Sequence, residues 1–144
     1  PMQGFAVNDA TVAGINTGYV EDKKILLHED SDADAKSSAL PSACYLSHLD
    51  LQLTETTGTA TKVSAFLAWD SNGDDPMTGE SPGNPLWTGM TGTNLRNTSI
   101  ALDVWVTAPA SQTTQGKCYL WLKTDAGVVS CTKARLHWAM RATV

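Results

Sequence analysis

"SIALDVWV", residues 99–106, decides the class of fold, because its apolar and polar side chains alternate one by one. One face of this extended segment would carry Ile100, Leu102, Val104 and Val106. The opposite face would carry Ala101, Asp103 and Trp105. A period of two residues is typical of a β-strand that buries one of its faces. No segment of the chain shows the sustained spacing of an amphipathic helix.

The same alternation occurs in four further segments. They are "YLSHLDLQL" (45–53), "KVSAFLAW" (62–69), "KCYLWLKT" (117–124) and "ARLHWAMR" (134–141). In the first of them, the spacing predicts that Tyr45 shares a face with Leu49, Leu51 and Leu53. Glycine-containing segments at 57–59 and 125–127 separate some of these strands, and both predict short hairpin turns.

The first 42 residues have a different character. "KKILLHE" (23–29) predicts a strand, and the acidic run that follows predicts a solvated loop. Residues 1–20 are sparse in charge and mixed in pattern, which predicts an extended arm. We therefore expect an N-terminal arm over 1–42, with one strand and an acidic loop, and a β-sandwich domain over 43–144. The expected fold is all-β, an antiparallel β-sandwich, of which the jelly roll is one variant.

Composition argues against several classes of protein. The chain has 144 residues and a formal net charge of −5, and its ten basic residues are scattered. A nucleic-acid partner is not expected, because such proteins concentrate Lys and Arg to neutralise phosphates. No apolar run reaches the ~20 residues that span a bilayer, and no signal peptide is visible. We expect a protein made in the cytoplasm, with no membrane partner.

Three cysteines, Cys44, Cys118 and Cys131, lack the spacing of a zinc site. An odd number without a signal peptide predicts structural free thiols, with a disulfide or a ligand role as alternatives. No cofactor is expected.

Large aromatic side chains are predicted on faces turned away from the core. They are Phe66, Trp105, Tyr119 and Trp121. Scattered exposed aromatic residues are ordinary, but four on strands that look central are less so, because each can bury roughly 150–250 Å². Three interpretations stay open: loops or the N-terminal arm cover these rings, the rings form an interface with a partner or another subunit, or they bind sugars.

The loop "DSNGDD", residues 70–75, raises the question of calcium. Asp70, Asn72 and Asp74 match positions 1, 3 and 5 of an EF-hand loop. Asp75 stands where that loop needs Gly, and Ser81 stands where it needs Glu. A structural loop with Asx turns is the favoured interpretation, and a calcium site is the alternative.

No catalytic motif is present in the sequence. The adjacent carboxylates Asp74 and Asp75 have no rigid partner across a cleft. The histidines fall in strand-like segments, and a serine, histidine and aspartate triad requires a geometry that sequence does not reveal. An enzyme is therefore not expected.

Three stretches together resemble small β-rich virion proteins of tailed bacteriophages, which decorate the head or contribute to head fibres. They are "VSAFLAWDSNGDDPMTGES" (63–81), "SIALDVWVTAPASQTTQGKCYLWLKTDAG" (99–127) and "ARLHWAMR" (134–141). The resemblance implies a structural protein, a capsid decoration (cement) protein on the capsid exterior. It implies the major capsid protein as partner and a homo-oligomer, most simply a homotrimer, because capsids offer threefold sites. It carries over no individual contact residue.

One alternative function stays open, that of a carbohydrate- or receptor-binding β-sandwich of fibre or lectin type. In that case Trp105, Tyr119 and Trp121 would stack on sugars, and the Asp70–Asp75 loop would lie at the ligand end.

Overall fold

The computed structural model describes residues 3–28, 37–57, 62–82, 95–113 and 115–140. In these ranges nearly all regular structure is β. The strands are β1 (Gln3–Asn8), β2 (Val12–Ile15), β3 (Ile25–Leu27), β4 (Ala43–Thr57), β5 (Val63–Ala68), β6 (Ser81–Pro82), β7 (Leu95–Thr107), β8 (Cys118–Thr124) and β9 (Val128–Ala139). Two short 3₁₀ turns, η1 (Glu21–Lys23) and η2 (Ala110–Gln112), interrupt the connections. No helix in the described ranges is long and apolar enough to cross a membrane.

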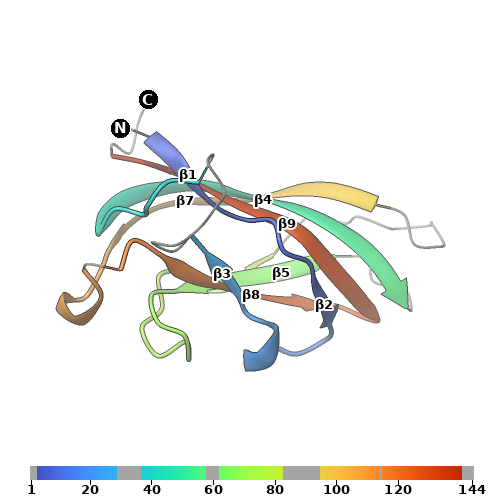
Figure 1. Ribbon diagram of the computed structural model, residues 1–144. Coiled ribbons are helices and arrows are strands. Elements are labelled where there is room, and N and C mark those ends of the chain that lie inside the picture. Colours follow the sequence, from blue (N-terminus) through green and yellow to red (C-terminus); the bar gives the residue numbers. More distant parts are fainter. Residues whose placement is uncertain (1–2, 29–36, 58–61, 83–94, 114, 141–144) are drawn as a thin grey trace.

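The strands form two antiparallel sheets packed face to face, which confirms the predicted all-β sandwich (Figure 1). One sheet has the order β1-β9-β4-β7, and β2 also pairs with β9. The other has the order β3-β8-β5-β6. In Figure 1, β1, β4, β7 and β9 form the upper layer, and β3, β5 and β8 lie below them.

The strand order is that of a jelly roll. The chain folds back between β5 and β6, so that β5 pairs with β6, β4 with β7, β3 with β8, and both β1 and β2 with β9. This long double ribbon then rolls up, which brings β4 against β9 and β5 against β8. Rolling closes the two sheets over one core. It also leaves β7 at one edge of the five-stranded sheet and β1 at the other.

The two predicted hairpins are wrong. β4 belongs to the five-stranded sheet and β5 to the four-stranded sheet, so the strands on either side of residues 57–59 do not pair. Residues 58–61 themselves lie outside the described residues. β8 and β9 likewise belong to different sheets, so residues 125–127 cross from one sheet to the other. Gly127 does have the positive φ, 71°, that was the reason for expecting a turn there.

Strands from the N-terminal 42 residues pair with strands from the remainder of the chain. β1 runs antiparallel to β9 from Gln3 opposite Ala139 to Asn8 opposite Ala134. The predicted strand within 23–29 is β3, which pairs with β8. Ala6, Val7 and Ile15 are buried. The described strands of this segment thus add to both sheets, and Ala6, Ile15, Ile25, Leu27 and Leu40 belong to the common core. Most of the acidic run lies outside the described residues.

The ladder between β4 and β7 is irregular, and a bulge shifts the side-chain alternation of β4. Relative to β9, β4 has one extra residue at Ser47. The prediction for Tyr45 is therefore wrong: Cys44 and Leu46 point into the core, while Tyr45 lies on the outer face. A second bulge in β7 places Asp103 at a positive φ of 49°. A bulge on an edge strand interrupts its regular row of free backbone groups, and this limits edge-to-edge aggregation.

Aliphatic side chains from both sheets fill the core. The largest fully buried ones include Leu46, Leu49 and Leu53 of β4, Ile100 of β7, Leu67 of β5, Leu120 of β8 and Leu136 of β9. Alternation is cleanest on β7, where Ile100 and Val106 are buried and every second residue from Leu95 to Thr107 is exposed. The period of two in the sequence therefore corresponds to an inner and an outer face, as predicted.

We expect Gly4→Ala to destabilise the protein by about 1–3 kcal/mol, as overpacking typically does. A Cβ atom at this position would lie 2.3 Å from the Ser38 hydroxyl oxygen and 2.7 Å from the Trp138 ring. Urea denaturation provides the measurement. Gly79→Ala is the matched control, because a Cβ there meets nothing within 4 Å. Equal midpoints for the two variants would contradict the close packing of β1 on Trp138.

The outer face of the five-stranded sheet as the candidate functional site

The four predicted interface rings lie on two different surfaces. Phe66 of β5, with Tyr119 and Trp121 of β8, lies on the side of the four-stranded sheet turned away from the core. Trp105 lies on the outer face of the five-stranded sheet, across the sandwich. The sequence could not distinguish these surfaces, because both sheets show the same alternation.

The chain itself covers part of the aromatic cluster on the four-stranded sheet. Phe66 stacks on Trp121 with ring centroids 4.9 Å apart and planes 2° apart. Tyr19, from the N-terminal segment, packs edge-on against Phe66 at 4.8 Å. Gly73 of the β5–β6 connection lies close to the six-membered ring of Trp121. Trp121 is consequently only 4 % exposed.

Polar contacts fix this cover in place. The Tyr19 hydroxyl donates a 2.8 Å hydrogen bond to Glu80, whose carboxylate also lies 3.0 Å from the Lys123 ammonium. The ammonium lies 5.0 Å from the centre of the Tyr19 ring. Burial, followed by the bond to Glu80, raises the pKa of Tyr19. Trp121 therefore has little surface left for a partner. Of the three interpretations of the outward rings, cover by the chain's own segments is the one that applies to Trp121.

Trp105 has the opposite environment. It is 48 % exposed, on the edge strand β7. Its neighbour across the ladder is Tyr45 of β4. The Tyr45 hydroxyl donates a hydrogen bond to the Asp103 carboxylate, and this bond raises the pKa of Tyr45. Of the four predicted rings, Trp105 offers the most surface to a partner.

On the same face of the sheet, two histidines and an aspartate come together. His48 of β4 lies directly opposite His137 of β9, and their rings stack with centroids 4.0 Å apart and planes 17° apart. Asp50, two residues further along β4, has Oδ2 2.8 Å from Nε2 of His137 and 3.6 Å from Nε2 of His48. Within the described part of the chain, this is the one group of three residues suited to hold a metal ion.

The charges of this cluster depend on its surroundings. Burial tends to raise the pKa of Asp50, but the hydrogen bond from Ser99 and the two histidines outweigh it and hold that pKa below its ordinary value. Burial, with a contribution from His48, lowers the pKa of His137. These shifts favour an ionised Asp50 and a neutral His137.

The cluster does not have the geometry of a serine hydrolase triad. Ser99 is hydrogen-bonded to the Asp50 carboxylate and not to an imidazole. Ser47 does bond to Nδ1 of His48 at 2.8 Å, but Nε2 of that ring is 3.6 Å from Asp50, too far for a hydrogen bond. A triad needs one imidazole hydrogen-bonded to both the hydroxyl and the carboxylate.

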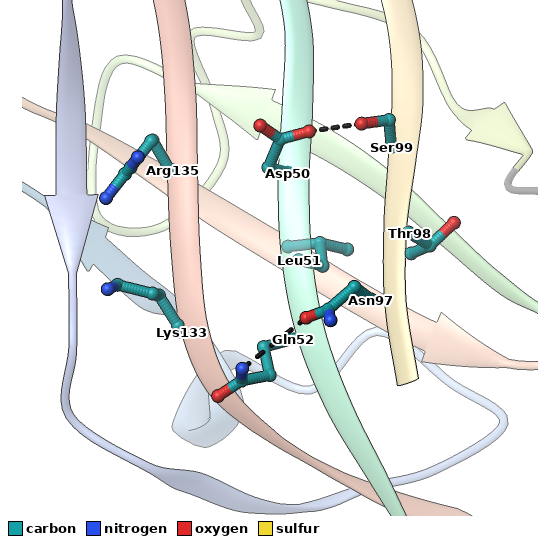
Figure 2. Close-up of a pocket in the computed structure, with 8 residues that line it drawn as sticks. All are labelled: Asp50, Leu51, Gln52, Asn97, Thr98, Ser99, Lys133 and Arg135. Carbon is teal, nitrogen blue, oxygen red and sulfur yellow. Dashed lines mark hydrogen bonds between the residues drawn. The ribbon is translucent and has the colours of Figure 1, made fainter. Parts of the chain in front are cut away.

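A shallow depression of about 420 Å³ continues from Asp50 along the sheet. Its polar lining comes from three adjacent strands (Figure 2): Asp50 and Gln52 of β4, Asn97 and Ser99 of β7, and Lys133 and Arg135 of β9. A second depression of about 370 Å³ lies on the other side of the histidines, between Tyr45 and Phe5. The outer face of the five-stranded sheet thus offers an exposed indole, two hollows and many hydrogen-bonding groups.

The Asp70 loop is built as a turn. One oxygen of the Asp70 carboxylate accepts a 2.8 Å hydrogen bond from the Asp75 amide, and the other accepts one of 3.1 Å from the Asp74 amide. The side-chain oxygen of Asn72 also accepts from the Asp74 amide, at 3.3 Å. These oxygens, which a calcium ion would need, therefore bind the backbone of the loop, as in Asx turns.

All three thiols should be unreactive in the native protein. Cys44, Cys118 and Cys131 are buried and free, and burial raises the pKa of Cys44 and of Cys131 to about 12. Because the thiolate is the reacting form, a thiol-specific reagent should label the folded chain slowly and all three cysteines at once on unfolding. Rapid labelling of one thiol in the native protein would contradict this packing.

Comparison with known proteins adds no assignment: no protein-family model matches the chain, and a search of curated proteins finds no significant match.

Proposed function

We propose that this protein is a virion structural protein, a capsid decoration protein that binds the outside of a phage head and stabilises the shell. The observation that carries the proposal is the outer face of the five-stranded sheet, where Trp105 stands 48 % exposed on a strand whose outward residues are all exposed. The resemblance to small phage virion proteins points to the same class. The jelly roll is compatible with it, but that fold serves capsid proteins and lectins alike.

The face has the composition of a protein–protein interface. Energetically important interface residues are often Trp, Tyr and Arg, placed among polar groups that form hydrogen bonds at the rim. Here Trp105 and Tyr45 would be the anchors, and Asp50, Ser99 and Arg135 would belong to the polar surround. A standard interface buries roughly 1,200–2,000 Å² in total, which requires a surface about as large as a whole sheet face.

The mechanism would be linkage between binding and assembly. A protein that binds neighbouring capsid subunits in the assembled shell, and binds separated subunits poorly, stabilises the shell by mass action. The partner is the major capsid protein, and a homotrimer on threefold positions would satisfy the symmetry of the lattice. The protein would be made in the host cytoplasm and act on the capsid exterior.

Co-sedimentation with heads tests this function. Heads assembled from the capsid protein encoded with this chain, and lacking the protein, are mixed with purified protein and pelleted. The proposal requires saturable binding and heads that withstand higher temperature once saturated. Protein that stays in the supernatant at concentrations well above those of the capsid subunits would refute it.

Carbohydrate binding is the second candidate, and the two depressions favour it. Amide, carboxylate and basic side chains line the depression beside Asp50. Tyr45 and Phe5 border the second depression. Such polar groups next to aromatic rings suit sugar hydroxyls and sugar faces. A glycan array, read with and without a chelator, distinguishes this function from the first, because a decoration protein should bind no glycan.

A further inference from the structure

We propose that His48, Asp50 and His137 form a binding site for a divalent transition-metal ion, with Zn²⁺ as the best-suited ion. The site goes beyond the proposed function and does not depend on it. It was not predicted from the sequence, because His48 and His137 are far apart in the chain and meet only through the register of β4 with β9.

The sheet register places three ligands on one surface. His48 and His137 are directly paired across two strands, where Cβ atoms are about 4.5–5.5 Å apart. Asp50 lies two residues from His48 on the same strand and so points to the same side. The candidate ligand atoms, one from each residue, all lie within 4.8 Å of one another.

Neighbouring hydroxyl groups bind the far atoms of His48 and Asp50, so a metal ion would replace only the hydrogen bond between His137 and Asp50. Ser47 is hydrogen-bonded to Nδ1 of His48, which leaves Nε2 to face Asp50. Ser99 donates to Oδ1 of Asp50, which leaves Oδ2 to face both imidazoles. Hydrogen bonds of this kind orient metal-binding side chains and are a regular feature of metal sites.

Small side-chain rotations would complete the geometry. With metal–ligand bonds of about 2.0–2.1 Å, a tetrahedral ion holds its ligand atoms roughly 3.4 Å apart. The separation of 3.6 Å between His48 and Asp50 already fits. The separation of 2.8 Å between His137 and Asp50 would lengthen, and the two stacked imidazoles would tilt toward a common point. All three side chains are partly exposed, so they can rotate and water can supply a fourth ligand.

The donor set determines the kind of ion. Two imidazole nitrogens and one carboxylate oxygen suit Zn²⁺ and its neighbours Co²⁺ and Ni²⁺. Ca²⁺ and Mg²⁺ prefer oxygen ligands alone, so they should not compete.

Calorimetric titration of the chelator-treated protein with ZnCl₂ tests the site. We expect one Zn²⁺ per chain and an unchanged isotherm in the presence of excess Ca²⁺. Asp50→Asn, which is close to isosteric and keeps a partner for Ser99, should weaken binding at least tenfold, and His48→Ala with His137→Ala should abolish it. His28→Gln is the matched control, because His28 is not part of the cluster, and it should bind like the wild type.

A spectroscopic readout keeps the test independent of folding losses in any one variant. Co²⁺ bound at the site should give visible absorption that Zn²⁺ removes, and Asp50→Asn should reduce it while the circular dichroism of the protein stays unchanged. Absence of binding to the wild-type protein would overturn the proposal. So would binding that survives in Asp50→Asn and in the double histidine variant.

Discussion

Replacing Trp121 by alanine should lower the free energy of unfolding by about 3–5 kcal/mol, the usual cost of removing a buried tryptophan. The indole is 4 % exposed, stacks on Phe66, and is covered by Gly73 of the β5–β6 connection. Its loss would leave a cavity between the four-stranded sheet and the segments that cover it. Tyr19 would also lose its support, because it packs on the Phe66 ring. Urea denaturation followed by circular dichroism is the measurement.

Trp105→Ala is the matched control for this experiment. The residue type and the substitution are the same, but Trp105 is 48 % exposed and should change stability by no more than about 0.5 kcal/mol. Trp121→Phe should recover part of the loss, because it keeps a ring against Phe66. Equal stabilities of the two alanine variants would show that the cover over the four-stranded sheet does not protect Trp121.

For binding to phage heads, Trp105→Ala should have a larger effect than Trp121→Ala, the reverse of their effects on stability. Trp105→Ala should weaken binding to phage heads by about 2 kcal/mol or more, which is roughly 30-fold in the dissociation constant. The reason is that an exposed indole next to Tyr45 gains more by burial in an interface than any other side chain known to be exposed on this face. Co-sedimentation over a range of protein concentrations gives the constants.

Val20→Ala is a suitable control for the binding experiment. Val20 is also an exposed apolar residue, but it precedes η1 in the N-terminal segment and lies outside the five-stranded sheet. Its replacement should leave head binding unchanged. If Trp105→Ala bound as tightly as the wild type, the outer face of the five-stranded sheet would not be the docking surface.

Side-chain alternation predicted the strands well, since burial repeats every two residues wherever the ladder is regular. It failed at the bulge in β4, although it held through the irregularity in β7. The bulge at Ser47 moves Tyr45 to the outer face, and nothing in "YLSHLDLQL" marks the position of that extra residue. Tyr45 is the cross-strand neighbour of Trp105, so this error concealed the aromatic pair.

The pairing of strands was beyond local sequence. Asp125-Ala126-Gly127 has the composition of a hairpin turn, and Gly127 has the expected positive φ. The same short turn can pass the chain to the opposite sheet, and the choice depends on how the double ribbon rolls. The pairing of His48 with His137 also depends on how the double ribbon rolls, because rolling brings β4 against β9. The sequence did contain one sign of the histidine–aspartate cluster, because His48 and Asp50 are two residues apart on a predicted outer face. The third residue, His137, joins them only through the register of β4 with β9.

Oxidative footprinting of the tryptophans on heads is the most direct test of the central claim, that the outer face of the five-stranded sheet is the working surface. Hydroxyl radicals should oxidise Trp105 readily in the free protein, while the buried Trp69, Trp121 and Trp138 serve as internal controls with low reactivity. On binding to heads, oxidation of Trp105 should fall severalfold and that of the three controls should stay constant. Protein that is fully bound while Trp105 remains as reactive as in the free state would contradict the account.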